Sequence, residues 1–141
     1  MGYRKKLIIV CPFVLFVMSA LGCRDNADIY PVHGKVVFSD GQPATELAGG
    51  LIVFKSLDGK PGNANGSIQN DATFRISTKG GHDGAYLGRH QAIVTPPRGD
   101  RDNARPNVID RRHMDFETSG IQIEVQPKTN DVTITVDRFK R

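Results

Sequence analysis

His33, His82, His90 and His113 are the only histidines of the chain, and they are its first candidates for metal or acid–base chemistry. A zinc peptidase needs histidine and glutamate side chains at a fixed spacing, to hold the metal and activate a water molecule. None of the four histidines is followed by a glutamate at that spacing, and no Gly-x-Ser-x-Gly sequence marks a serine hydrolase. We therefore predict no catalytic residue, no metal site and no cofactor, and we expect a protein that is not an enzyme.

His90 alternates with Ala92 and Val94, so its side chain is predicted to point into the core. A buried histidine is more often a hydrogen-bonded core residue than a ligand, and we interpret His90 in that way.

The segment from Arg98 to His113 is rich in both arginine and aspartate. Its Asp100-Arg101-Asp102-Asn103 sequence begins like a calcium loop but lacks the oxygen ligand, glycine and glutamate that should follow. Arg98-Gly99-Asp100 spells an adhesion tripeptide, a match that arises often by chance. We interpret 98–113 as a solvated loop pinned to the domain by Val108 and Ile109, with a helical turn after Pro106. A functional loop is the alternative.

Cys23 is the residue for which we predict a chemical modification. It follows a basic start, Arg4 to Lys6, and an apolar run of 15 residues from Leu7 to Leu21. A membrane-spanning helix needs about 20 apolar residues, so this run is typical of a signal peptide. Gly22-Cys23 at its end resembles the bacterial lipobox, in which the cysteine thiol is diacylglycerated and the cysteine becomes the new N-terminus. The alternative is an ordinary secretory signal that leaves Cys23 as a free thiol.

These features divide the chain into a lipoprotein signal peptide (1–22), a tether (23–29) and a β-sandwich domain (30–141). The protein is expected to be exported and held on a bacterial membrane by its N-terminal lipid, at the periplasmic face or the cell surface. The six residues from Arg24 to Ile29, at about 3.4 Å each, reach only about 20 Å, so the domain is expected to stay close to the bilayer.

Charge argues against nucleic acid as a partner. The chain has 19 Lys and Arg against 15 Asp and Glu, but the signal peptide holds three of the basic residues and no acidic one. The remainder is nearly neutral, whereas a nucleic-acid-binding domain needs a basic face. Both cysteines precede the domain, so its stability is expected to come from core packing alone.

Short runs of alternating apolar and polar residues, separated by Gly, Asn, Asp and Pro, predict seven strands and no long helix. They are 30–38, 51–54, 63–69, 73–77, 88–95, 121–126 and 132–137. This pattern predicts an all-β domain, a seven-stranded Greek-key β-sandwich. Leu51 to Phe54 is apolar throughout, and we predict that both of its faces are covered.

Two stretches are predicted to form antiparallel units. Residues 66–97 contain short strands separated by turns, and we expect them to pair consecutively. Ile121 to Val136 is predicted to form a hairpin around the turn at 127–131, with Ile123, Val125, Val132 and Ile134 pointing into the core.

Several sequence segments occur in the order known from one type of domain. They are Tyr30-Pro31-Val32-His33-Gly34-Lys35-Val36, Asp40-Gly41-Gln42-Pro43, Asp83-Gly84-Ala85, Gly88 to Val94 and Asp115 to Ile121. With the segment ending at Cys23, they resemble the small lipoproteins of planctomycete-type bacteria that carry a carboxypeptidase regulatory-like domain, which is a transthyretin-like (prealbumin-like) sandwich. The chain departs from that pattern at Ala72, where the family has glycine, at His90, where it has tyrosine, and at Phe116, where it has proline.

The resemblance implies an architecture and a location but no substrate. One enzyme branch of the transthyretin-like fold hydrolyses 5-hydroxyisourate and ends in Tyr-Arg-Gly-Ser, whereas this chain ends in Arg138-Phe139-Lys140-Arg141. We therefore expect a non-catalytic, membrane-anchored lipoprotein of the cell envelope with a structural or interaction role. The alternative is a ligand-binding module that holds a glycan or peptide at a sheet edge or at the 98–113 loop. The expected partners are the membrane, through the lipid, and an envelope protein or glycan.

Overall fold

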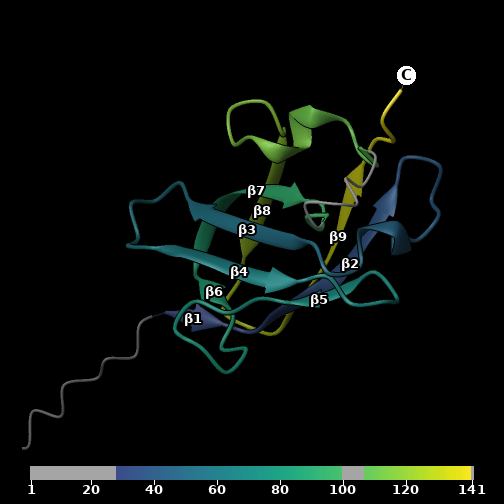
Figure 1. The fold of residues 1–141 in the computed structure, drawn as a ribbon. Helices are drawn as coiled ribbons and strands as arrows, with labels where there is room; N and C mark the ends of the chain where they lie inside the picture. Colours follow the sequence, from purple (N-terminus) through teal and green to yellow (C-terminus); the bar gives the residue numbers. More distant parts are fainter. Residues whose placement is uncertain (1–27, 100–106, 141) are drawn as a thin grey trace, which may run out of the picture.

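The computed structural model describes residues 28–99 and 107–140, which form nine β-strands and two short 3-10 helices (Figure 1). The strands are β1 (Ile29–Tyr30), β2 (Val32–Phe38), β3 (Leu51–Ser56), β4 (Asn63–Ser67), β5 (Thr73–Arg75), β6 (Ala85–Tyr86), β7 (Gly88–Thr95), β8 (Ile121–Val125) and β9 (Asn130–Val136). The helices are η1 (Thr45–Leu47) and η2 (Arg111–Met114). The all-β prediction is confirmed. No helix in the described part of the chain is long and apolar enough to cross a membrane.

Two main sheets face one another, which gives the domain its β-sandwich character (Figure 1). Their strand orders are β5-β2-β9 and β4-β3-β7-β8, and β1 pairs with β6 in a separate two-stranded sheet. All strand pairs are antiparallel except β2 with β9, which are parallel. The sequence predicts seven strands, and the structure differs by β1 and β6. Each of these has two residues, too few to produce an alternating pattern.

Side chains from both main sheets meet in one core. Val32, Val36 and Phe38 are buried along β2, as their alternation predicts. The largest fully buried side chains are Phe38, Phe54, Phe74, Leu47, Ile52, Ile76, Ile109, Ile134, Val36, Val94, Val125 and Val136. Burying a side chain of this kind stabilises the fold by about 1.5–3 kcal/mol. Because the domain has no cysteine, and so no disulfide, its stability depends on the packing of this apolar core.

The predicted hairpin over Ile121 to Val136 is wrong. β8 pairs with β7 in one sheet and β9 pairs with β2 in the other, so the connection between them crosses the sandwich. Asn130, which is buried, organises this crossing. Its side-chain oxygen accepts a hydrogen bond from the Gln126 N–H at 2.9 Å, and its side-chain nitrogen donates to the Lys128 carbonyl at 2.7 Å. The Asn130 N–H also donates to the Pro31 carbonyl, which directs the chain to β2.

The strands within 66–97 do not pair consecutively, contrary to the prediction. β4 and β7 flank β3 in the four-stranded sheet, whereas β5 lies at the edge of the other sheet. The two sheets approach one another where Asn65 and Ser77 exchange main-chain hydrogen bonds of 2.9 and 2.8 Å. The short turns that we interpreted as hairpin connections therefore move the chain between sheets.

β3 is covered on one face, not on two as its apolar sequence predicts. Ile52 and Phe54 are fully buried, but Leu51 keeps 38% of its surface exposed and Val53 is half-buried. Composition alone does not reveal which face of a strand is covered, because apolar residues also occur at the surface.

The loop from Ser77 to Gly84 is closed by the carboxylate of Asp83. The Asp83 carboxylate accepts hydrogen bonds from the N–H groups of Thr78 and Lys79, at 2.7 and 2.9 Å, and from the Ser77 hydroxyl at 3.1 Å. Burial alone would raise the pKa of Asp83, but these donors hold it below its ordinary value. The loop fixes His82 next to β5 and leads into β6.

The described part of the 98–113 segment is pinned as predicted. Ile109 is fully buried, and the half-buried Val108 packs against the core. Helix η2 begins at Arg111, a few residues beyond Pro106. Residues 100–106 lie outside the described residues, and so do the predicted calcium-like segment and Asp100 of the adhesion tripeptide.

Candidate functional site

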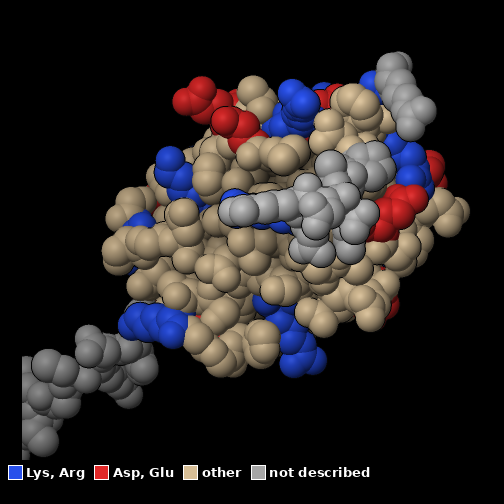
Figure 2. All heavy atoms as spheres, viewed as in Figure 1, with Lys and Arg blue, Asp and Glu red and all other residues tan. Residues whose placement is uncertain are grey.

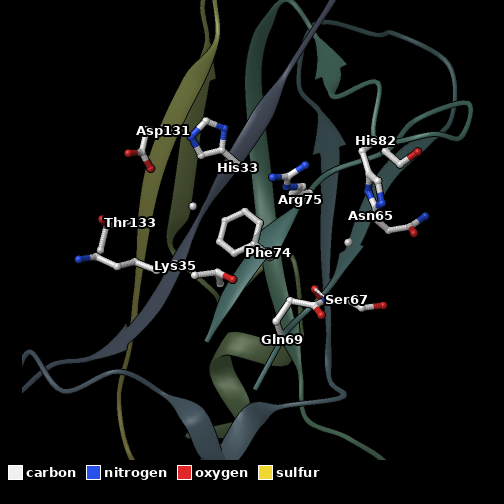
Figure 3. Close-up of a pocket in the computed structure, with 14 residues that line it drawn as sticks. His33, Lys35, Asn65, Ser67, Gln69, Phe74, Arg75, His82, Asp131 and Thr133 are labelled. Carbon is white, nitrogen blue, oxygen red and sulfur yellow. Dashed lines mark hydrogen bonds between the residues drawn. The ribbon is translucent and has the colours of Figure 1, made fainter. Parts of the chain in front are cut away.

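An open groove of about 1040 Å³ lies over the outer face of β5, β2 and β9 and reaches the neighbouring strand β4 (Figure 3). The exposed side chains that line it are His33, Lys35, Asn65, Ser67, Gln69, Thr73, Arg75, His82, Asp131 and Thr133. Phe74 forms part of its floor from the core side. A groove of this size is sufficient for a small molecule or a short peptide.

Strand register sets the pattern of side chains across the groove. His33 lies opposite Arg75 on one side and Asp131 on the other, and Lys35 lies between Thr73 and Thr133. The outward positions of three neighbouring strands therefore form two polar rows. In Figure 3, Arg75 lies between His33 and the pair of Asn65 and His82, whereas Lys35 extends toward Thr133.

Three arginines outside the groove have carboxylate partners. Arg89 pairs with Asp58 at 3.1 Å, Arg138 pairs with Glu46 at 2.9 Å, and Arg112 pairs with Asp137. Neither Lys35 nor Arg75 forms an ion pair with a carboxylate within residues 28–99 and 107–140. Both can therefore receive a negative group without first giving up a partner.

The outer face of β3 and β4 offers a contrasting surface. Figure 2 shows the side on which β3 and β4 lie in front, and most of its visible centre is uncharged, with Lys, Arg, Asp and Glu at its rim. Outward side chains here include Val53 and its cross-strand neighbour Asn65, which also lines the border of the groove. Nothing in this arrangement of the described residues places reactive groups together.

His90 lies in the core, which confirms the prediction. It is 2% exposed, its Nδ1 lies 3.1 Å from the Gly88 carbonyl oxygen, and its ring centre is 5.9 Å from that of Phe54. Burial lowers the pKa of His90, although the Gly88 carbonyl and the Asp58 carboxylate act in the opposite direction. A neutral, hydrogen-bonded imidazole of this kind is a packing residue.

His113 lies in η2 and ties that helix to the end of β9. The Asp137 N–H donates to His113 Nε2 at 3.0 Å, and the Asp137 carboxylate accepts from the Arg112 guanidinium. The Arg112 side chain, whose hydrogen bond to the carboxylate is the largest cause, holds the pKa of Asp137 below its ordinary value. The other ring nitrogen of His113, Nδ1, is buried and has no hydrogen-bond partner in the described region. This cluster fastens the segment that contains η2.

The other two candidate histidines, His33 and His82, both line the groove. Cys23, the one residue with a predicted modification, lies outside the described residues. The described ranges contain no group of three His, Cys, Asp or Glu side chains placed to hold a metal ion. The sequence predicts a ligand site only at a sheet edge or at the 98–113 loop, not a groove across a sheet face. It indicates the polar outward residues of β2, β5 and β9, but not that these strands are neighbours, because their pairing is long-range.

No family model matches the chain, and no curated protein matches it. Two solved structures, both DUF3823 family proteins, are similar to it. The protein from Parabacteroides merdae is 14% identical, with a TM-score of 0.46, over 80% of this chain and 48% of that one. The protein from Bacteroides ovatus is 11% identical, with a TM-score of 0.45, over 78% and 45%. The chain thus spans about half the length of these two proteins, and at this level of similarity neither assigns it a family or a function.

Proposed function

We propose that this chain is an exported bacterial lipoprotein, anchored through Cys23, whose β-sandwich is a non-catalytic structural or interaction module of the cell envelope. The observation that carries the proposal is the short apolar run that ends in Gly22-Cys23, a few residues before the first strand of the folded domain. Two or three acyl chains on one cysteine give stable anchoring, whereas a single chain does not.

The fold type within this proposal is a transthyretin-like Greek-key sandwich of the carboxypeptidase regulatory-like kind. The strand orders β5-β2-β9 and β4-β3-β7-β8 support it, because the seven predicted strands supply these two sheets. The Asp83-Gly84-Ala85 motif also supports this fold type, because its three residues have defined places in the structure. Asp83 closes a loop, Gly84 packs against β1, and Ala85 pairs with Tyr30, so each residue of that motif has a structural role.

The non-catalytic role is supported by what the histidines contact. His90 packs beside Phe54, and His113 binds the main chain of Asp137. Each uses its ring to stabilise the fold.

A second candidate function is ligand binding. The observation that favours it is the polar groove beside β5, an edge strand, where Arg75 and Lys35 have no carboxylate partner in the described region. Of the two sites expected from the sequence, a sheet edge and the 98–113 loop, the groove borders the first at β5 and also extends over β2 and β9.

Mass spectrometry of the protein purified from a bacterial membrane tests the anchor. We expect a mature chain that begins at an acylated Cys23, and we expect Cys23→Ser to move the protein to the soluble exported fraction. Cys11→Ser is the matched control, because Cys11 lies within the segment to be removed. An unmodified Cys23, or an N-terminus elsewhere, would contradict the proposal.

A further inference from the structure

Charge is distributed unevenly along the groove over β5, β2 and β9. Arg75 lies on the side toward β4, with Asn65 and His82 beside it (Figure 3). Asp131, the acidic side chain of the groove, lies on β9 beyond His33. Negative charge in a ligand is therefore favoured over β5 and β2 and disfavoured over β9.

Arg75 is suited to bind a carboxylate. Its guanidinium presents several N–H donors in one plane, and a carboxylate accepts two of them at once. The neighbouring Asn65 amide and His82 imidazole can donate further hydrogen bonds. Because Arg75 has no ion-pair partner in the described residues, a carboxylate would not have to displace one.

Lys35 is a second side chain that can bind a carboxylate, at a distance from Arg75 that the strand register sets. Arg75 lies opposite His33, so Lys35 occupies the diagonal position on the next strand. Diagonal side chains of an antiparallel pair start about 7–8 Å apart. Alternate residues of an extended peptide are separated by about 6.4–6.8 Å, since each residue advances the strand by about 3.2–3.4 Å. The flexible Lys35 stem accommodates the small difference.

The groove also favours a peptide over a saccharide. Saccharide sites are commonly built on exposed aromatic faces, and the one aromatic side chain among the described residues of the groove, Phe74, is only 1% exposed. Amide and hydroxyl groups of Asn65, Ser67 and Gln69 line the side next to β4, where they can pair with the main chain of a bound segment.

We infer that this groove binds an extended acidic peptide segment, with Arg75 holding one carboxylate and Lys35 a second one two residues along. This inference rests on the proposed interaction role and gives it a site and a ligand class. Asp131 sets the polarity of the segment, because it repels acidic residues that extend over β9.

The test uses the full-length protein in a non-ionic detergent and a short fluorescent peptide with Asp at alternate positions and Thr between them. We expect saturable binding that weakens with added salt, since exposed charges are screened beyond about 10 Å at 0.1 M ionic strength. The same peptide with Asn in place of Asp should not bind. Equal binding of both peptides, or none by either, would overturn the inference.

Variants of the protein locate the binding site. Arg75→Gln should weaken binding by about tenfold, because charge-assisted hydrogen bonds are roughly twice as strong as neutral ones. Lys35→Gln should weaken it less, and Asp131→Asn should strengthen it. Arg89→Gln is the matched control, since it makes the same change of charge at an exposed arginine that already pairs with Asp58. An equal loss in Arg89→Gln, or no loss in Arg75→Gln, contradicts the assigned site.

Polygalacturonate serves as the competing anion. If it binds through Arg75 and the peptide does not, the peptide assignment is wrong and an acidic glycan takes its place. If the peptide does not bind, the proposal that Cys23 is acylated is unaffected. That proposal is tested separately, by the mass of the protein and by its presence in the membrane fraction. The two proposals can therefore fail independently.

Discussion

The carbonyl oxygen of Tyr30 occupies the space where a side chain on Gly84 would have to be placed. A Cβ atom built on Gly84 would overlap this oxygen and crowd the main chain of Pro31. Gly84 also has a φ of 106°, which L-residues with a side chain rarely adopt. The contact joins the end of the Asp83-closed loop to the point where the chain enters the sandwich.

Gly84→Ala should therefore destabilise the domain strongly. Overlap in a packed site costs about 1–3 kcal/mol, and the left-handed conformation adds about 1–2 kcal/mol. Gly59→Ala is the control, because Gly59 has a φ of 75° and a Cβ atom there would meet no neighbouring atom within 4 Å. Urea unfolding should show a clearly larger loss for Gly84→Ala. Similar losses in the two variants would mean that backbone strain alone accounts for the effect.

The register of β9 can be tested with two adjacent residues. Ile134 is fully buried and Thr133 is exposed on the outer face. Ile134→Ala should lower the free energy of unfolding by about 2–5 kcal/mol, whereas Thr133→Ala should change it by less than about 0.5 kcal/mol. Chemical denaturation measures both. If the two effects were exchanged, the strand would be shifted by one residue.

Ala72 should tolerate glycine unusually well. It is buried but has a φ of 65°, a conformation that glycine adopts without steric cost. Replacing it removes a buried methyl group, worth about 0.8 kcal/mol, and relieves about 1–2 kcal/mol of left-handed strain. Ala92→Gly, in the middle of β7, has only the first effect and a further entropic cost of about 0.5–1 kcal/mol. Thermal or urea unfolding should rank Ala72→Gly as the more stable variant, and the opposite order would contradict the turn conformation.

His90 should make the domain less stable in mild acid. Burial lowers its pKa in the folded state, against the Gly88 carbonyl and Asp58, while the unfolded chain keeps a value of about 6.5. Between these two values the unfolded chain binds the proton and the folded chain does not. Stability therefore falls as the pH drops through about 6.5, by at most about 1.4 kcal/mol per pH unit for this group.

His90→Phe provides the comparison, because it keeps a ring beside Phe54 and removes the titration. Unfolding measured from pH 8 to pH 5, a range above the ordinary aspartate pKa of about 3.9, should be less pH-dependent in the variant. The carboxyl groups with lowered pKa values, those of Asp58, Asp71, Asp83 and Asp137, stay ionised there. Identical pH profiles would show that His90 does not contribute.

Local patterns in the sequence predicted the strands better than they predicted strand partners. Period-two alternation placed β7 at Gly88–Thr95 and put His90 inside, because burial of one face acts on each strand separately. The β8–β9 connection could not be assigned in this way. A turn sequence is compatible with a hairpin or with a crossing between sheets, and here the side chain of Asn130 decides through hydrogen bonds to the residues around it.

The groove could not be predicted from the sequence for a related reason. Arg75, Lys35 and Asn65 come from three strands, and their proximity depends on β2 lying between β5 and β9 and on β4 approaching β5. No spacing in the sequence encodes that arrangement. The sequence does indicate which residues face outward, and this is why the groove is polar.

The parallel pairing of β2 with β9 has a consequence for the order in which the domain can assemble. Among the described strands, β2 is synthesised early and β9 is synthesised last. Until residues 130–136 have been synthesised, β2 lacks its neighbour on one side, and the three-stranded sheet β5-β2-β9 stays incomplete. Contacts between such distant parts of a chain form slowly. A growing chain would thus remain without its finished core until β9 has been made, a state that suits the export across a membrane that we propose.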